Sequence, residues 1–310
     1  MHEPICKYFH VGLIHPMAYP SVIKGEGPIV ETLREILNDE YFGAVEVTWI
    51  HDPKVRAEVA QMLKYAHVDI IFAGQPPLLL QKLDLNNGEE NSRKAAIDQC
   101  KRSVDQAYEL GASIMAVLSG SDPSDGDRQG AKQRLVDSLI EICNYAKAQR
   151  PQEPLTISLE TFDQNIDKKC LIGPTDDAVE VAEAVTREAE NFGLTVDLSH
   201  QPLLGETINH MVIKASPYLI HTHIGNCVMK DAEHPAYGDQ HPIFGCSCGE
   251  VDVPEVAEFL RCLLDTGYFK KNVPTKMPVV SFEIKPLPGE ESGIIVAAAK
   301  RVLNEAWARL

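Results

Sequence analysis

The segment LTISLETFD at residues 155–163 is a short β-type apolar run that carries a carboxylate, Glu160, near its end. Three later segments have the same form, namely LTVDLSH at 194–200, LIHTHIGN at 219–226 and VVSFEIKP at 279–286. Short apolar runs of this kind predict buried strands. In each of the three, a side chain that can bind a metal stands at or near the carboxyl end of the strand: Asp197, His223 and Glu283.

Similar runs alternate eight times with longer amphipathic stretches along the chain. The expected strands are 8–14, 44–49, 68–73, 113–118, 155–160, 194–198, 219–224 and 279–284. Repeated strand–helix units give parallel strands joined by right-handed crossovers. Eight such units in 310 residues predict an α/β protein with one domain, a closed (β/α)8 TIM barrel over residues 1–310. No G-x-G-x-x-G turn follows the first strand, which disfavours a dinucleotide-binding sheet.

Composition limits the partners that the chain can have. The formal net charge of −16 argues against a nucleic-acid groove, because such a groove needs clustered Lys and Arg facing phosphates. No run reaches the ~18 apolar residues of a membrane span, and the first residues form no apolar signal sequence. The eight cysteines include no CxxC pair, so we expect reduced thiols and a cytoplasmic protein.

Four side chains at four successive strand ends predict a metal site. Barrel enzymes build their sites at the carboxyl ends of strands, where Glu160, Asp197, His223 and Glu283 are expected to meet. Unpaired buried carboxylates are costly, and one cation offsets that cost for three of them together. Three carboxylates and one imidazole suit Mn, Mg or Co better than an ion that prefers thiolates. The sequence therefore predicts one divalent ion.

Other polar residues near the strand ends are candidates for substrate contact. His221 and His223 face into the barrel by the period of two, and His223 is the ligand because it lies closer to the carboxyl end. We expect His221 to be a deeper, hydrogen-bonded core residue. Lys285 shares a face with Glu283 at the rim, and His200 lies beyond the end of its strand, placed to contact substrate.

Weaker candidates follow the other strands. Glu46 lies in the second strand, His15 follows the first, and Lys230 lies in a long loop after the seventh strand, residues 225–250. We expect these three to contact substrate, and we expect the loop to form a lid or to bind a partner. Gln75 after the third strand and His241 in the same loop are further candidates.

The strand-end pattern E…DxxH…HxH…E resembles that of the xylose-isomerase-like barrel superfamily, and in particular its D-tagatose 3-epimerase branch. The similarity covers nearly the whole chain, and the pattern is specific for the superfamily but not for a substrate. The resemblance implies that Glu160, Asp197, His223 and Glu283 hold Mn or a similar ion. It also implies that the two glutamates exchange a proton of the substrate and that His200 binds sugar oxygens.

The chain departs from this branch at one position. An arginine is expected six residues after the metal-binding histidine, but Met229 stands there, with Lys230 next to it. This difference bears on how the substrate lies, and so on which sugar is bound.

The expected activity is that of a divalent-metal-dependent epimerase or isomerase of a ketose or oxo-sugar. The reaction would proceed by proton abstraction next to the carbonyl, through an enediolate that the metal stabilises. The alternative is a metal-dependent lyase on 3-oxo-glycosides, as in the catalytic subunits of C-glycoside deglycosidases. An endonuclease-IV-like phosphodiesterase shares the fold, but needs additional His and Asp ligands and a basic surface that are not evident here. A non-catalytic sugar-binding barrel is the last alternative.

The expected partners follow from these alternatives. A small-molecule sugar is the expected substrate, and neither nucleic acid nor a membrane is an expected partner. The chain is expected to form a homo-oligomer, or to bind a small partner subunit if it is a lyase.

Overall fold

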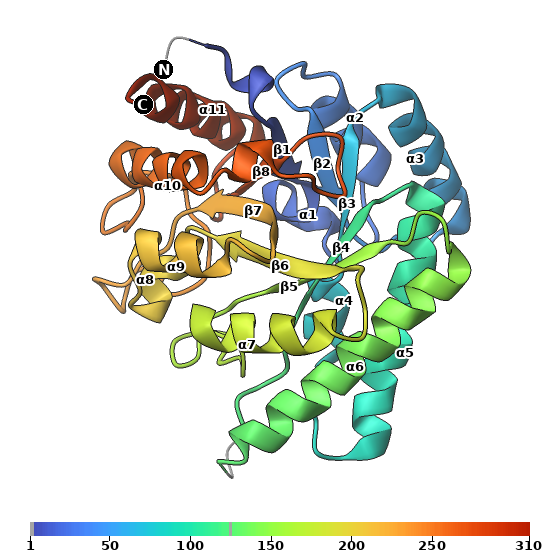
Figure 1. Ribbon diagram of the computed structural model, residues 1–310. Helices are drawn as coiled ribbons and strands as arrows, with labels where there is room; N and C mark the ends of the chain where they lie inside the picture. The colour runs from blue at the N-terminus through green and yellow to red at the C-terminus, as the bar shows by residue number, and fades with distance from the viewer. Residues whose placement is uncertain (1–2, 124–125) are drawn as a thin grey trace.

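Eight parallel strands form a closed barrel in chain order, and helices surround it (Figure 1). This computed structural model describes residues 3–123 and 126–310. β1 pairs with β8 as well as with β2, which closes the barrel. The strands are β1 (His10–Ile14), β2 (Ala44–Val47), β3 (Asp69–Ala73), β4 (Ile114–Leu118), β5 (Thr156–Glu160), β6 (Phe192–Asp197), β7 (Leu219–Gly225) and β8 (Val279–Glu283). The predicted TIM barrel is confirmed, with strand ends within two residues of those expected.

Long helices cover the outside of the barrel, and short ones begin close to the carboxyl ends of some strands. The α-helices are α1 (His15–Ala18), α2 (Ile29–Leu37), α3 (Pro53–Ala66), α4 (Gln75–Gln81), α5 (Glu90–Leu110), α6 (Arg128–Gln149), α7 (Thr175–Thr186), α8 (His200–Leu204), α9 (Ile208–Ala215), α10 (Val253–Asp265) and α11 (Ser292–Ala308). Short 3-10 helices lie at Ile5–Lys7, Pro20–Val22 and Tyr268–Lys270. Among the described residues, no helix has the length and apolar character needed to cross a bilayer.

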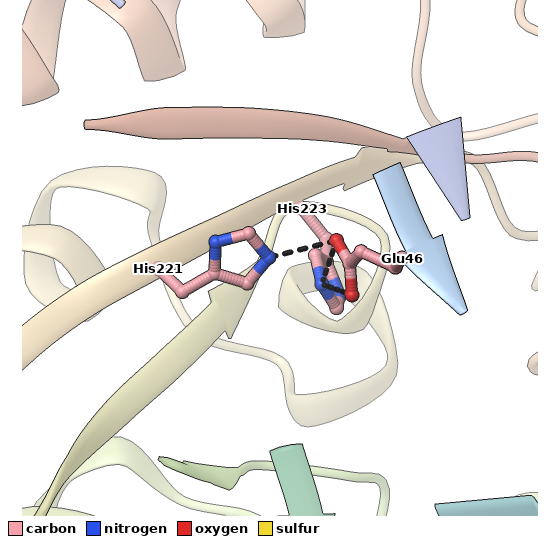
Figure 2. Close-up of side chains that lie close together, drawn as sticks. All are labelled: Glu46, His221 and His223. Carbon is pink, nitrogen blue, oxygen red and sulfur yellow. Dashed lines mark hydrogen bonds and ion pairs between the residues drawn. The ribbon is translucent and has the colours of Figure 1, made fainter. Parts of the chain in front are cut away.

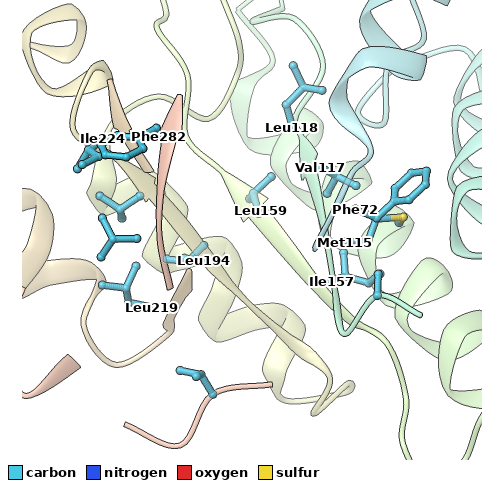
Figure 3. Close-up of a cluster of buried hydrophobic side chains, with 14 of the residues drawn as sticks. Phe72, Met115, Val117, Leu118, Ile157, Leu159, Leu194, Leu219, Ile224 and Phe282 are labelled. Atoms are coloured by element: carbon cyan, nitrogen blue, oxygen red, sulfur yellow. The ribbon is translucent and has the colours of Figure 1, made fainter. Parts of the chain in front are cut away.

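Apolar side chains pack on both sides of the strands. The larger cluster lies between the strands and the helices, where Phe72, Met115 and Leu159 are fully buried (Figure 3). A second, small cluster lies apart from it, with these members: Ala44, Ile71, Ile114, Ile220 and Val279. Because these residues stand at or near the first position of their strands, they fill the amino end of the barrel. Polar groups inside the barrel are thereby kept toward the carboxyl end.

The period of two along β5 to β8 places polar residues in two levels above this apolar floor. The lower level holds Ser158, Thr195, His221 and Ser281, and the upper level holds Glu160, Asp197, His223 and Glu283. In the lower level the hydroxyls of Ser158 and Thr195 are 2.6 Å apart and share a hydrogen bond. The lower level therefore supports the strand-end residues from below.

The loop after β7 is fastened at both ends by one side chain. Asn226 is fully buried, and its Oδ1 accepts hydrogen bonds from the backbone N–H groups of Cys227, Glu250 and Val251. Further along, the backbone N–H of Lys285 donates to the carbonyl of His241 over 2.7 Å. This second contact holds the middle of the loop against the end of β8, at the mouth of the barrel.

Candidate metal centre

The carboxyl ends of β5 to β8 bring Glu160, Asp197, His223 and Glu283 together. One possible ligand atom from each lies within 4.8 Å of the others, and all four residues are buried. His223 Nδ1 is at the centre, 3.1 Å from Glu160 Oε1 and 2.9 Å from Glu283 Oε2. The four residues that the sequence places at strand ends thus form one cluster.

Glu46 of β2 reaches across the barrel to both histidines of β7 (Figure 2). Its Oε1 lies 2.8 Å from His221 Nε2 and 3.1 Å from His223 Nε2. Burial opposes the charge on Glu46, but the two imidazoles outweigh it and hold the pKa of this carboxyl well below its ordinary value. Since Nε2 of His223 faces a carboxylate, its Nδ1 is left to face Glu160 and Glu283, the arrangement found for metal-binding histidines.

The other carboxylates of the cluster are also held in place by neighbouring groups. Asp197 accepts the backbone N–H of Ser199 at 2.9 Å on Oδ1 and the Ser199 hydroxyl on Oδ2. Gln75, at the start of α4, donates its amide to Glu160 Oε2 over 2.6 Å. These contacts leave Glu160 Oε1 directed toward His223 Nδ1.

A second buried cluster, centred on Asp239 in the loop after β7, adjoins the first. Asp239 Oδ1 lies 3.1 Å from His200 Nε2 and 2.9 Å from His241 Nε2, and Oδ2 lies 3.1 Å from Lys168 Nζ. Lys168 belongs to the segment between β5 and α7, and His200 begins α8. Asp239 therefore joins three separate segments above the barrel mouth.

Glycine at position 225 permits the end of β8 and His241 to lie close to the backbone of β7. A Cβ there would lie 2.6 Å from the carbonyl oxygen of Glu283 and 3.0 Å from His241 Nδ1. Any side chain would therefore displace either the end of β8 or His241 from the cluster.

The imidazoles of these clusters lie in a strongly negative environment. Burial lowers the pKa of His200, but Asp239 and Asp197 outweigh burial and raise it to about 10. In the same way, Glu283 and Asp239 outweigh burial and raise the pKa of His241 to about 9. Glu46 and Glu160 hold the pKa of His223 well above its ordinary value despite burial. The site thus stabilises positive charge.

The donor set of the first cluster fits a divalent cation. It offers three carboxylates and one imidazole, and hard oxygen donors of this kind suit Mn, Mg or Co. Glu283 Oε2 lies near His223 Nδ1 but off the direction of a hydrogen bond, and among the described residues it has no hydrogen-bond partner. A cation would satisfy this buried oxygen.

Asp239 supplies a group that the sequence did not make evident, and it lies beside His241, which was among the weaker candidates. Asp197, His200 and His241 form a second set of possible metal ligands, which shares Asp197 with the first. His200 and His241 are therefore candidates for the additional ligands that an endonuclease-like enzyme is expected to need. A basic surface is still not indicated, since the net charge is −16. The D-x-H spacing at 239–241 was the available signal, but the course of a long loop cannot be predicted from spacing.

A cavity of about 220 Å³ opens above the first cluster. Glu46, Glu160, His223 and Glu283 line its floor and charged side, together with residues of the loop after β7. Lys285 also lines the cavity, and its Nζ donates to Gln240 Oε1 over 3.2 Å. Glu46 and Lys285 therefore border this cavity, and their contact with a substrate stays a prediction.

Three other candidates for substrate contact lie outside the lining of this cavity, as far as the described residues define it. His200 is fully buried between Asp197 and Asp239. His15 is buried beside Thr32, 2.7 Å from its hydroxyl, and burial lowers the pKa of His15 to about 3. Lys230 has a 63% exposed side chain and pairs with Glu250 at 2.9 Å.

Comparison with solved structures finds barrels of the same fold. A D-tagatose 3-epimerase-like protein has a TM-score of 0.70 at 17% identity, over 97% of this chain and 99% of that chain. The IOLI protein with a bound zinc atom has a TM-score of 0.71 at 16% identity, over 97% and 99%. The 3-keto-D-glucoside 4-epimerase from E. coli has a TM-score of 0.64 at 15% identity, over 96% and 99%. At these identities the likeness shows the fold alone.

Comparison with curated proteins gives no match. A family model described as the xylose isomerase-like TIM barrel matches residues 38–271, which span β2 to β7 entirely and most of the surrounding helices. This match, over a closed barrel with the expected cluster of side chains at the strand ends, shows that the chain belongs to the xylose isomerase-like TIM barrel family.

Proposed function

We propose that the protein is a divalent-metal-dependent epimerase or isomerase of a ketose or oxo-sugar. The observation that carries this proposal is the placement of Glu160 and Glu283 on either side of His223 Nδ1, on strands that β6 and β7 separate. Both glutamates line the same cavity. Two carboxylates that approach one point from different sides suit a reaction in which a proton leaves one face of a carbon and returns to another.

We propose Glu160, Asp197, His223 and Glu283 as the metal ligands, with Nδ1 as the ligand atom of His223. Mn is our first choice, and Mg and Co are alternatives of similar chemistry. A divalent cation at this position would polarise the carbonyl of a bound sugar and so acidify the neighbouring C–H bond.

The remaining chemistry belongs to side chains of the protein. Each glutamate has one oxygen near His223 Nδ1 and a second oxygen elsewhere: Glu160 Oε2 beside Gln75, and Glu283 Oε1 at 3.4 Å from His241 Nε2. We propose that one of these second oxygens removes the proton next to the carbonyl. For epimerisation the other glutamate, in its protonated form, donates its own proton to the opposite face of the same carbon and is left as a carboxylate. For isomerisation the first glutamate delivers the abstracted proton to the neighbouring carbon, while the hydroxyl proton of the enediol passes between the two oxygens. Lys285 is placed to bind a sugar hydroxyl at the rim.

A lyase that acts on 3-oxo-glycosides is the second candidate. The same proton abstraction becomes an elimination when a leaving group stands on the next carbon. The observation that favours it is an apolar side of the cavity, formed in part by Leu79 and Leu80, which a free sugar would leave without a partner.

The deciding experiment incubates the metal-loaded protein in deuterated water with ketoses and 3-oxo-glycosides and follows the recovered sugars by proton NMR. Deuterium next to the carbonyl of recovered sugar supports the epimerase or isomerase. Release of an aglycone without exchange into recovered substrate supports the lyase.

We expect one tightly held divalent ion per chain and a loss of that ion in Glu283→Gln. The amide keeps the size of the side chain but removes a charge from the ligand set, so the metal should dissociate at a higher free concentration. Elemental analysis after dialysis against a metal buffer measures the content. Full activity of the chelated protein would contradict the metal proposal, and two ions per chain would show that the second ligand set is also occupied.

Glu46→Gln tests the partner of His223. We expect metal affinity to fall about 10- to 100-fold, the usual effect of removing a carboxylate that orients a metal-binding histidine. Glu35→Gln is the matched control, because Glu35 is an exposed residue that accepts a hydrogen bond from Tyr19. Equal metal affinity in both variants, measured by competition with a chelating dye, would show that Glu46 does not support the ligand.

A further inference from the structure

The cavity above the metal ligands has two chemically different sides. Its charged side comes from β2, β5, β7, β8 and the loop after β7, and includes Glu46, Glu160, His223 and Glu283. Its other side, which we call the apolar wall, consists of Pro16, Met17, Ile23, Pro76, Leu79 and Leu80. These six residues lie after β1 or after β3, on the part of the barrel that does not provide the ligands.

The apolar wall exposes leucines where a folded protein normally buries them. Leu79 and Leu80 of α4 are 41% and 45% exposed, whereas Leu78 beside them is buried and anchors the helix. Among the described residues, the other exposed large apolar side chains are Tyr65, Ile213 and Ile294, which lie on α3, α9 and α11. Two adjacent exposed leucines at the mouth of a cavity therefore point to an apolar ligand group.

A free sugar does not match the apolar wall. Every non-carbonyl carbon of a simple ketose carries a hydroxyl group, and a hydroxyl that is buried against apolar side chains loses water without gaining a hydrogen bond. A glycoside with an apolar aglycone matches both sides, because its sugar ring can face the ligands while its aglycone contacts the leucines.

We propose that the substrate is an oxo-glycoside whose apolar aglycone binds to the apolar wall, with Leu79 and Leu80 as residues that determine specificity. This proposal rests on the function proposed above, since it assigns the sugar ring to the metal side. A second copy of the chain is a poorer occupant. The exposed leucines adjoin the cavity, and among the described residues the other exposed large apolar side chains lie on other helices, so they do not extend the apolar wall into a wider face for a subunit contact.

The first experiment measures turnover of phenyl and methyl 3-oxo-β-D-glucosides by the metal-loaded protein. We expect kcat/KM for the phenyl compound to exceed that for the methyl compound by about tenfold or more, as for an apolar group that fills an apolar site. In the double variant Leu79→Gln/Leu80→Gln this ratio should fall toward one. The matched control Ile213→Gln/Ile294→Gln makes the same chemical change at residues that are 58% and 61% exposed, and should keep the wild-type ratio.

The second experiment separates this proposal from the proposed reaction. Calorimetric titration with the unoxidised phenyl and methyl β-D-glucosides measures binding without turnover. A preference for the phenyl glucoside that disappears in Leu79→Gln/Leu80→Gln supports the aglycone site, even if no oxo-sugar is converted. Equal binding and equal turnover of the phenyl and methyl compounds by the wild type would overturn it. The proposal would also be overturned if the wild type were a dimer, the leucine variant were a monomer, and the ratio of phenyl to methyl turnover were the same in both.

Discussion

Glu160→Gln is expected to stop the exchange of the substrate's carbon-bound proton with solvent. Glutamine keeps the shape of the side chain and the neighbourhood of Gln75, but it cannot accept a proton at the reacting carbon. A positioned general base contributes about 10²- to 10⁴-fold to the rate, and we expect a loss of that size. The measurement is deuterium incorporation by proton NMR, in protein saturated with Mn.

A comparison with Asp197→Asn distinguishes loss of the base from loss of the metal. Both residues belong to the proposed ligand set, but Asp197 is held by Ser199 and is assigned no proton transfer. Excess Mn should therefore restore exchange in Asp197→Asn and leave Glu160→Gln inactive. If excess metal restores both variants equally, Glu160 acts only as a ligand.

Asp239→Asn is expected to lower the free energy of unfolding by about 3–5 kcal/mol, because removing one partner leaves buried charges without compensation. Asp239 is buried among the cations of His200, His241 and Lys168. Its own pKa is held well below the ordinary value, since those cations outweigh the effect of burial. Urea unfolding monitored by circular dichroism measures the difference.

The pH dependence of this difference has a definite sign. The pKa of His200 is raised from 6.5 to about 10 in the folded protein. The ion pair of protonated His200 with Asp239 therefore contributes fully to the free energy of unfolding below pH 6.5, and this contribution is lost as the pH rises through about 10. The deficit of Asp239→Asn should therefore shrink toward high pH. Asp231→Asn, in the same loop, is the control, because the side chain of Asp231 is only partly buried and accepts a hydrogen bond from the backbone N–H of Glu233. A deficit no larger than that of the control would contradict the role of Asp239.

Strand periodicity was sufficient to predict the barrel and the grouping of four possible metal ligands at the strand ends. Both depend on local sequence, since alternation fixes which side chains face inward and the barrel brings strand ends together. The role of Glu46 could not be predicted, because its contacts to His221 and His223 cross the barrel between β2 and β7. The periodicity of a strand predicts whether a side chain faces into the barrel, but it does not predict which residue of the opposite strands that side chain contacts.

The segments above the barrel were less predictable. α4 could not be predicted from the sequence, because a helix as short as Gln75–Gln81 depends on the packing of Leu78 rather than on its own propensity. Asp239 was not recognised, because its partners come from segments far apart in the sequence. Such tertiary contacts determine the conformation of a long loop, and they cannot be predicted from the spacing of residues in the sequence.

The attachment of the loop after β7 bears on how enzymes of this kind diversify. Asn226 binds the backbone on both sides of the loop, at Cys227 and at Glu250 and Val251, so the two ends meet whatever lies between them. Compact loops with adjoining ends tolerate changes of length and sequence with little effect on the scaffold. Exchange of the intervening segment between homologous barrels could therefore transfer substrate preference while the proposed metal ligands stay in place, provided that the incoming segment keeps an aspartate with the contacts of Asp239 to His200 and Lys168.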